Sequence, residues 1–240
     1  MATLARHPQD GRTAPRRPSE SFLMLPVTLF LASTFLALGY VAHILWPRWP
    51  DAPVAVDAPS LPIVIAGVIF NVAPGAIRVP VQRRPGAQER LDLVYLWPAL
   101  TPPEPTRPPP DSPSSTSDRV FVTIAASGGL LSPAERLKTI YPRYVQAEPM
   151  IGPDGLTLVK FLDGSPYRGE DLAFDAGAPD RFLARCSHNG SGPTRGTCLA
   201  ERRVGDANIT VRFPSDWISE WRNVADGIDR LVALLRPSGA

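Results

Sequence analysis

The feature that most constrains this chain is an uncharged apolar run from Phe22 to Trp46, which reads FLMLPVTLFLASTFLALGYVAHILW. A helix of that length extends about 37 Å, which exceeds a bilayer hydrocarbon core of about 30 Å. Tyr40, Trp46 and Trp49 lie towards its end, as aromatic residues do at a membrane interface. The run therefore predicts a transmembrane helix over residues 22–46 and a lipid bilayer as its partner.

A cleaved signal peptide is the alternative for the same run. Ala37-Leu38-Gly39 is an acceptable cleavage sequence, but cutting there would leave the apolar stretch YVAHILW at the new N-terminus. The apolar part of a signal peptide is also shorter, about 7 to 15 residues. We therefore expect a retained single-pass anchor.

Basic residues predict the orientation of the anchor. Arg6, Arg12, Arg16 and Arg17 precede the run, whereas the twenty residues after it contain only Arg48. Because basic residues favour the cytoplasmic side, residues 1–21 are expected to form a cytoplasmic tail and everything after the span to be exported. The whole chain has 25 basic and 23 acidic residues, a balance that argues against nucleic acid as a partner.

Two cysteines agree with an exported domain. Cys186 and Cys198 enclose a loop rich in glycine, serine and asparagine that can turn back on itself. In an oxidising compartment such a pair is expected to form a disulfide, with a stabilisation of about 3 kcal/mol. The spacing does not match a redox CxxC motif, and one nearby histidine, His188, does not complete a zinc site.

Proline divides the exported part into segments. Five of the chain's 29 prolines lie in residues 47–62, which we expect to form a stiff stalk. Eight more lie in residues 98–117, which we expect to be a disordered Pro/Ser-rich loop or linker. Between them, residues 63–97 are expected to be folded: Ile63–Phe70 as a buried strand or short helix, and Leu91–Trp97 as a strand.

Residues 118–240 carry a mixed pattern that predicts an α+β domain with an antiparallel sheet. Ser132-Pro133-Ala134-Glu135 is a capping box that begins a short helix. Three closely spaced strand candidates predict an antiparallel meander near the cysteines. The expected strands are Asp118–Ala125, Leu156–Phe161, Arg181–Cys186, Thr197–Val204 and Asn208–Phe213.

The C-terminal segment has the clearest helical pattern, with an amphipathic stripe that ends before Pro237. This spacing fits both a coiled-coil seam and a helix packed on the sheet. Gly227 in mid-helix and the short length favour packing on the sheet. The packing residues are expected to be Trp217, Trp221, Val224, Ile228, Leu231 and Leu235.

Motifs for chemistry are sparse. The sequence has no GxSxG, GxxxxGK[ST] or GxGxxG, and no cofactor, nucleotide or metal site is expected. The enzymatic alternative is carboxylate-based, because two acids at a suitable separation can hydrolyse a glycan. Its weak catalytic candidates are Asp163, Glu170, Asp171 and Asp175, and acidic residues flanked by glycine and proline also predict solvated turns. The run TIYPRYVQ, with Tyr141, Arg143 and Tyr144, fits either a binding surface or a structural corner.

The order of basic tail, span, proline stalk and exported domain resembles N-terminally anchored periplasmic proteins of Gram-negative bacteria. The segments AIRVPVQRRPGAQERLDLVYLWP, RFLARC and ITVRFPSDWISEWRNV are similar to one such group. The resemblance implies an inner-membrane location with the C-terminal domain in the periplasm, but no activity, cofactor or catalytic residue. The favoured interpretation is a tethered, non-enzymatic binding or scaffolding protein with an envelope protein partner. A glycan hydrolase and a small-ligand sensor acting through a membrane partner are the alternatives.

Overall fold

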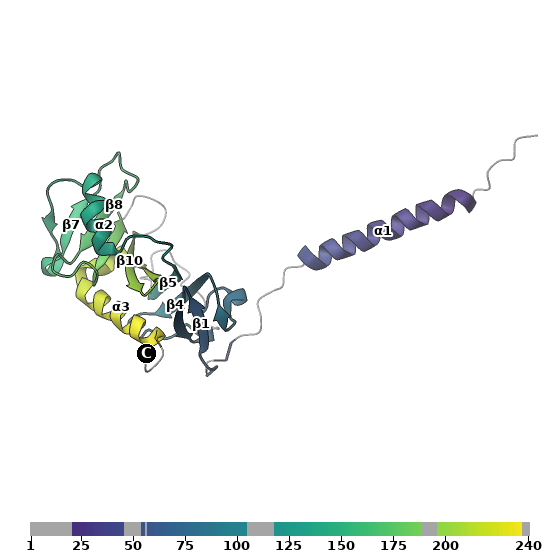
Figure 1. The fold of residues 1–240 in the computed structure, drawn as a ribbon, viewed down its shortest axis with the longest axis horizontal. Helices are drawn as coiled ribbons and strands as arrows, with labels where there is room; N and C mark the ends of the chain where they lie inside the picture. Colours follow the sequence, from purple (N-terminus) through teal and green to yellow (C-terminus); the bar gives the residue numbers. More distant parts are fainter. Residues whose placement is uncertain (1–20, 46–53, 56, 105–117, 189–195, 237–240) are drawn as a thin grey trace, which may run out of the picture. The chain divides into compact units, whose positions relative to one another are not determined.

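The computed structural model describes residues 21–45, 54–55, 57–104, 118–188 and 196–236 (Figure 1). Nearly all of the expected cytoplasmic tail, residues 47–53 and 56 of the stalk, and residues 105–117 of the linker lie outside that description. The chain forms two compact units, residues 1–50 and 51–240, and each is described by itself.

The first unit contains one helix, α1 (Ser21–Leu45), close to the expected span. Its stretch Met24–Ile44 is long and apolar enough to cross a membrane, with a mean hydropathy of 1.8. All side chains of that stretch are exposed. The hydroxyls of Thr28, Ser33 and Thr34 donate to carbonyls one turn earlier in the helix, which satisfies them without water.

The second unit is built on an eight-stranded sheet in which every neighbouring pair is antiparallel. The expected α+β class and the antiparallel sheet are confirmed. The strand order is β4-β5-β11-β10-β9-β8-β7-β6. The last three strands along the chain, β9 to β11, are neighbours in the sheet and form a meander, as expected. The strands are β4 (Arg90–Leu96), β5 (Arg119–Ala126), β6 (Met150–Ile151), β7 (Thr157–Lys160), β8 (Glu170–Phe174), β9 (Leu183–Ser187), β10 (Thr197–Val204) and β11 (Ala207–Pro214).

A second, three-stranded sheet corrects the expectation for Ile63–Phe70. That run is neither a single strand nor a helix but an antiparallel hairpin of β1 (Leu61–Ile65) and β2 (Val68–Val72), with β3 (Gly86–Ala87) beside β1. The turn residues Ala66 and Gly67 both have positive φ, 50° and 78°, as a tight hairpin turn requires. The continuous apolar sequence hides this turn because alanine carries no turn signal.

Two stretches expected to be irregular belong to the folded unit. The acidic segment that was expected to form turns contains β8, which pairs with both β7 and β9. At the start of the expected linker the chain folds back, since the Leu96 N–H donates to the Thr101 carbonyl at 2.8 Å and Leu100 is buried in the main core. The linker therefore starts later than residue 98.

Alternation along the strands gives the large sheet two different faces. Ala173 on β8 and Ala184 on β9 lie in the main core, whereas their neighbours Leu172 and Leu183 lie in a second cluster. Because successive side chains point to opposite faces, these clusters lie on opposite sides of the sheet. We call the side of the main core the inner face and the other side the outer face.

The second cluster is covered by α2 (Pro133–Thr139) and the 3₁₀ turn η3 (Tyr141–Arg143). The expected capping box is present: the Glu135 N–H donates to the Ser132 hydroxyl at 3.2 Å, and the Ser132 N–H donates to the Glu135 carboxylate at 2.7 Å. The other 3₁₀ turns are η1 (Pro74–Ala76), η2 (Pro80–Gln82), η4 (Pro153–Gly155) and η5 (Ser215–Glu220).

The C-terminal helix α3 (Trp221–Leu235) packs on the inner face, which confirms the sheet-packing interpretation (Figure 1). It starts later than the pattern suggested, because Trp217 belongs to η5, where it remains partly buried against the same core. The residues of the stripe that lie on α3 are all buried: Trp221, Val224, Ile228, Leu231 and Leu235.

Gly227 explains how closely α3 approaches the sheet. A Cβ at this position would lie 2.2 Å from an atom of the Trp97 ring. The Trp97 ring in turn packs against Trp217, with ring centroids 5.1 Å apart, so it has little room to move aside. The space left beside these residues is about 10 Å³, no more than the ~10–15 Å³ that a cavity needs to hold one water.

Gly227→Ala should lower the free energy of unfolding of the full chain by about 1–3 kcal/mol, because the added methyl overpacks this contact. In a helix with free space beside the glycine, the same change would stabilise the protein by up to about 1 kcal/mol. The sign of the change in the free energy of unfolding therefore distinguishes a tight contact at Gly227 from an open one. Urea unfolding in detergent, followed by circular dichroism, measures it. Gly164→Ala is the control, since nothing lies within 4 Å of its Cβ.

A second substitution identifies the cause. In a Trp97→Leu background, Gly227→Ala should lower the free energy of unfolding by less than it does in the wild type, because the clashing ring is gone. If the two changes are simply additive, the helix is not held at its position by the Trp97 contact.

Candidate functional site

The acidic candidates Asp163, Glu170, Asp171 and Asp175 lie along one segment but have different surroundings. Asp163 is exposed in the turn before β8. Asp175 follows β8 and accepts a hydrogen bond from the Gly177 N–H at 2.9 Å. These two carboxylates therefore belong to separate turns at opposite ends of the strand.

Glu170 and Asp171 are neighbours on β8, so their side chains point to opposite faces of the sheet. The Glu170 carboxylate lies 3.1 Å from the Arg185 guanidinium, and the Asp171 carboxylate lies 3.0 Å from Nε2 of His188. Each acid is paired with its own basic side chain. The strand geometry separates these two carboxylates instead of directing them to one substrate.

The run around Tyr141 forms a structural corner. Tyr141 is buried, with its ring centroid 5.7 Å from that of Phe161 and 5.6 Å from that of Tyr167. Tyr144 packs edge-on against the same Tyr167 ring, and Arg143 is exposed. These aromatic residues hold η3 on the outer face, and Tyr141 also lines a cavity of about 430 Å³.

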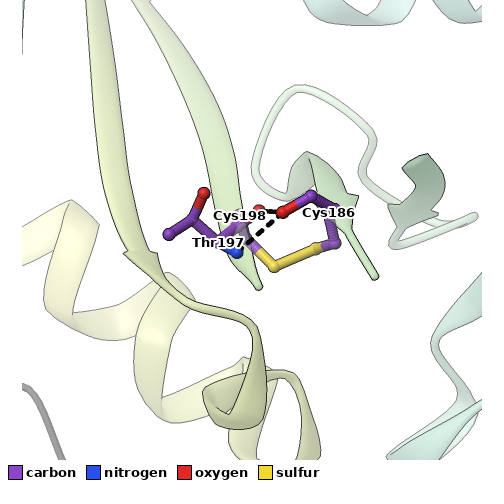
Figure 2. Close-up of a disulfide and its surroundings, with 4 residues drawn as sticks. Cys186, Thr197 and Cys198 are labelled. Atoms are coloured by element: carbon purple, nitrogen blue, oxygen red, sulfur yellow. Dashed lines mark hydrogen bonds between the residues drawn. A yellow bond between two sulfur atoms is a disulfide. The ribbon is translucent and has the colours of Figure 1, made fainter. Parts of the chain in front are cut away.

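The two cysteines lie directly opposite each other on β9 and β10 (Figure 2). Cys186 and Cys198 are joined by a disulfide, with their Cα atoms 4.0 Å apart, and both are buried. The bridge is therefore a cross-strand link within the sheet, at the base of the loop that connects β9 with β10. Within the described residues no group of three or more His, Cys, Asp or Glu side chains is close enough to hold a metal ion.

A different cluster lies on the outer face of β5 and β11. Arg119 and Phe121 alternate with the buried Val120 and Val122 along β5, and Arg212 is the Cα partner of Phe121 on β11. Arg78, from the segment between η1 and η2, places its guanidinium carbon 4.9 Å from the centroid of the Phe121 ring. We call Arg78, Arg119, Phe121 and Arg212 the arginine face.

The nearest acids leave this cluster basic. Asp92 is held by Arg90 at 2.8 Å and also accepts from Thr123, and the hydrogen bond from Arg90 keeps the pKa of Asp92 below its usual value. Asp118 lies 3.9 Å from Arg119. Within the described part of the chain, neither Arg78 nor Arg212 forms an ion pair.

Sequence reasoning missed this cluster for a physical reason. The basic run that includes Arg78 is typical of a solvated face. The alternation in RVFVTIA and NITVRF does place Arg119 and Arg212 opposite the apolar residues. The missing information was the pairing of β5 with β11, which brings residues about ninety positions apart into contact. The alternation was the one sequence signal that could have pointed to this cluster, and it does not show which strand lies beside β5.

No protein-family model matches this chain, and no curated protein matches it significantly. Two solved structures resemble it at low identity. One is an immunity protein of the Stenotrophomonas maltophilia type IV secretion system, with 11% identity and a TM-score of 0.52 over 75% of this chain and 94% of that chain. This likeness concerns the fold alone.

The other structure is the iron-regulated outer membrane lipoprotein FrpD of Neisseria meningitidis. It has 12% identity and a TM-score of 0.43, covering 78% of this chain and 96% of that chain. The similarity is too low to support an argument about this chain.

Replacing both cysteines, Cys186→Ser with Cys198→Ser, should lower the free energy of unfolding by about 3 kcal/mol, because the bridge closes a loop of twelve residues in the unfolded chain. Thermal unfolding of the full chain in detergent, with and without reductant, measures this. Reductant should lower the Tm of the wild type to that of the double variant and leave the variant unchanged. An equal Tm for all four samples would show that the bridge contributes no stability.

Proposed function

We propose that this chain is a membrane-tethered periplasmic protein of the cell envelope that binds or scaffolds another envelope protein without catalysing a reaction. The observation that carries the proposal is α1, in which every side chain from Met24 to Ile44 is exposed. A continuous apolar surface of that length is costly in water, at about 25 cal/mol for each Å². A bilayer removes this cost.

The export of the folded unit is supported by its disulfide, because such bonds persist in oxidising compartments. The orientation follows from the arginines that precede the span and their scarcity after it. Together these features favour an N-terminus in the cytoplasm and a C-terminal domain in the periplasm of a Gram-negative cell.

A binding role without catalysis is supported by the surroundings of the acidic candidates. Glu170 and Asp171 point to opposite faces and each is paired with a basic side chain, an arrangement that disfavours the glycan-hydrolase alternative. The fold similarity to a protein described as an immunity protein is consistent with a non-enzymatic envelope role. The small-ligand sensor has no specific support: the cavity of about 420 Å³ beside Pro74 has Glu104 as the sole ionisable residue among its described lining residues.

A reporter enzyme that is active only in an oxidising compartment tests the topology. Fused after Ala240 in a Gram-negative host, it should be active and remain in the membrane fraction after washing with high salt and carbonate. Substituting Leu31, Phe35 and Leu38 of α1 by arginine should abolish both properties, because each charge at the centre of a span costs about 3 kcal/mol. An inactive C-terminal fusion would overturn the proposed topology.

Crosslinking in living cells tests the binding role. The full chain carrying a photocrosslinking residue at exposed positions of the 51–240 unit should give a reproducible adduct with one membrane or periplasmic protein, identified by mass spectrometry. The same residue placed at Gly39 of α1 serves as a control for contacts made only within the bilayer. The absence of any adduct from the exported unit would count against a binding or scaffolding function.

A further inference from the structure

The arginine face combines three positive charges with one aromatic ring on a strand surface. Phe121 is partly exposed, Arg78 stacks over it, and Arg212 is exposed as its cross-strand neighbour. Cross-strand partners have Cβ atoms about 5 Å apart, so Arg212 lies beside the ring. Arg119 is two positions from Phe121 on the same strand and therefore on the same face.

One of these arginines has unused hydrogen-bonding capacity inside the fold. The side chain of Arg119 is only 16% exposed, and its Nε is buried without a hydrogen-bond partner. This Nε faces the Asp118 carboxylate at 3.9 Å, too far for a hydrogen bond. An incoming oxygen acceptor would contact the part of the Arg119 side chain that remains exposed, not the buried Nε.

The space beside Arg119 is suited to such an acceptor. A cavity of about 100 Å³ is lined by Arg119, Phe121, Gly196, Thr197, Arg212 and Phe213, with Pro214 at its rim. That volume corresponds to about three waters in the liquid. It admits the carboxylate end of an aspartate or glutamate side chain beside Arg119 and Arg212, with the partly exposed Phe121 ring next to its methylene carbons.

We propose that the arginine face is the docking site for an acidic segment of a partner protein, with one carboxylate placed between Arg119 and Arg212 and an apolar neighbour on Phe121. Charge complementarity selects this occupant: the cluster carries three arginines beside Asp118, and the other nearby acid, Asp92, is already held by Arg90. Arginine matches planar carboxylates with two parallel hydrogen bonds, and arginine and aromatic residues together dominate protein interfaces. This assignment rests on the proposed binding function and names the surface and the partner's chemistry.

The test uses the full chain in nanodiscs of neutral lipid and a fluorescein-labelled peptide of glutamate, serine and leucine. Its counterpart has glutamine in place of glutamate. The acidic peptide should bind at least about tenfold more tightly than the neutral one, and Arg119→Gln with Arg212→Gln should remove that difference. Rising salt should weaken binding of the acidic peptide to the wild type.

Arg143→Gln with Arg230→Gln is the matched control, because both residues are exposed and lie outside the arginine face. It removes the same charge and should leave the preference for the acidic peptide intact. Arg212→Gln alone, at an exposed position, should lower the preference in part without affecting folding. Equal binding of the two peptides by the wild type, or equal losses in the two double variants, would overturn the assignment.

The two proposals fail in different ways. If crosslinking in cells yields the same partner at equal amounts from the wild type and from Arg119→Gln with Arg212→Gln, the binding function stands and the arginine face is not its site. Binding of the wild type to phosphatidylglycerol vesicles without discrimination between the peptides would likewise overturn docking of a protein segment, because any anionic surface would then suffice.

Discussion

The ladders on both sides of β5 are the constraint on which the exported unit depends. Arg119–Ala126 pairs with β4 on one edge and with β11 on the other, so it joins the segment before the linker to the meander after it. The hairpin at Ile63 contacts β5 through β1 and contacts α3 through β2. One apolar core runs from Ile63 to Leu235 and includes Val122 at its centre. The same ladder brings Arg119 and Arg212 together on the opposite side.

Features that depend on neighbours in sequence were predictable here, and features that depend on distant partners were not. The capping box at Ser132, the whole of β10 and the buried stripe of α3 follow from spacing alone. The turn at Ala66-Gly67 was missed because its apolar flanks read as one strand. β8 was missed because Glu170 and Asp171 suggest a solvated turn, although strands on both sides provide their backbone partners. The stability that a strand gains from hydrogen bonds to neighbouring strands cannot be inferred from its local sequence pattern.

The two faces of the sheet respond to different requirements. On the inner face, Gly227 lets α3 approach the Trp97 ring so closely that almost no space remains, which fixes the register of the helix. On the outer face, α2 and η3 cover the end formed by β7 to β9, and Arg136 of α2 reaches Glu201 on β10. Arginines left at the other end repel one another and add nothing to core packing. Arg78 is stabilised over the Phe121 ring and Arg119 lies beside Asp118, and the acidic partner proposed for this face would offset the repulsion that remains.

Attachment to a membrane changes what affinity such a face requires. A docking site built from two guanidinium groups and one ring gives modest affinity in free solution, since much of the gain in contact is offset by lost translational freedom. When both partners are confined to one bilayer, that loss is already incurred, and the effective concentration of one near the other is high. A small, salt-sensitive contact then suffices for a stable assembly. On the proposed topology, α1 and the arginine face have complementary roles. The helix keeps the exported unit close to partners in the same membrane, and the arginines determine which partner binds.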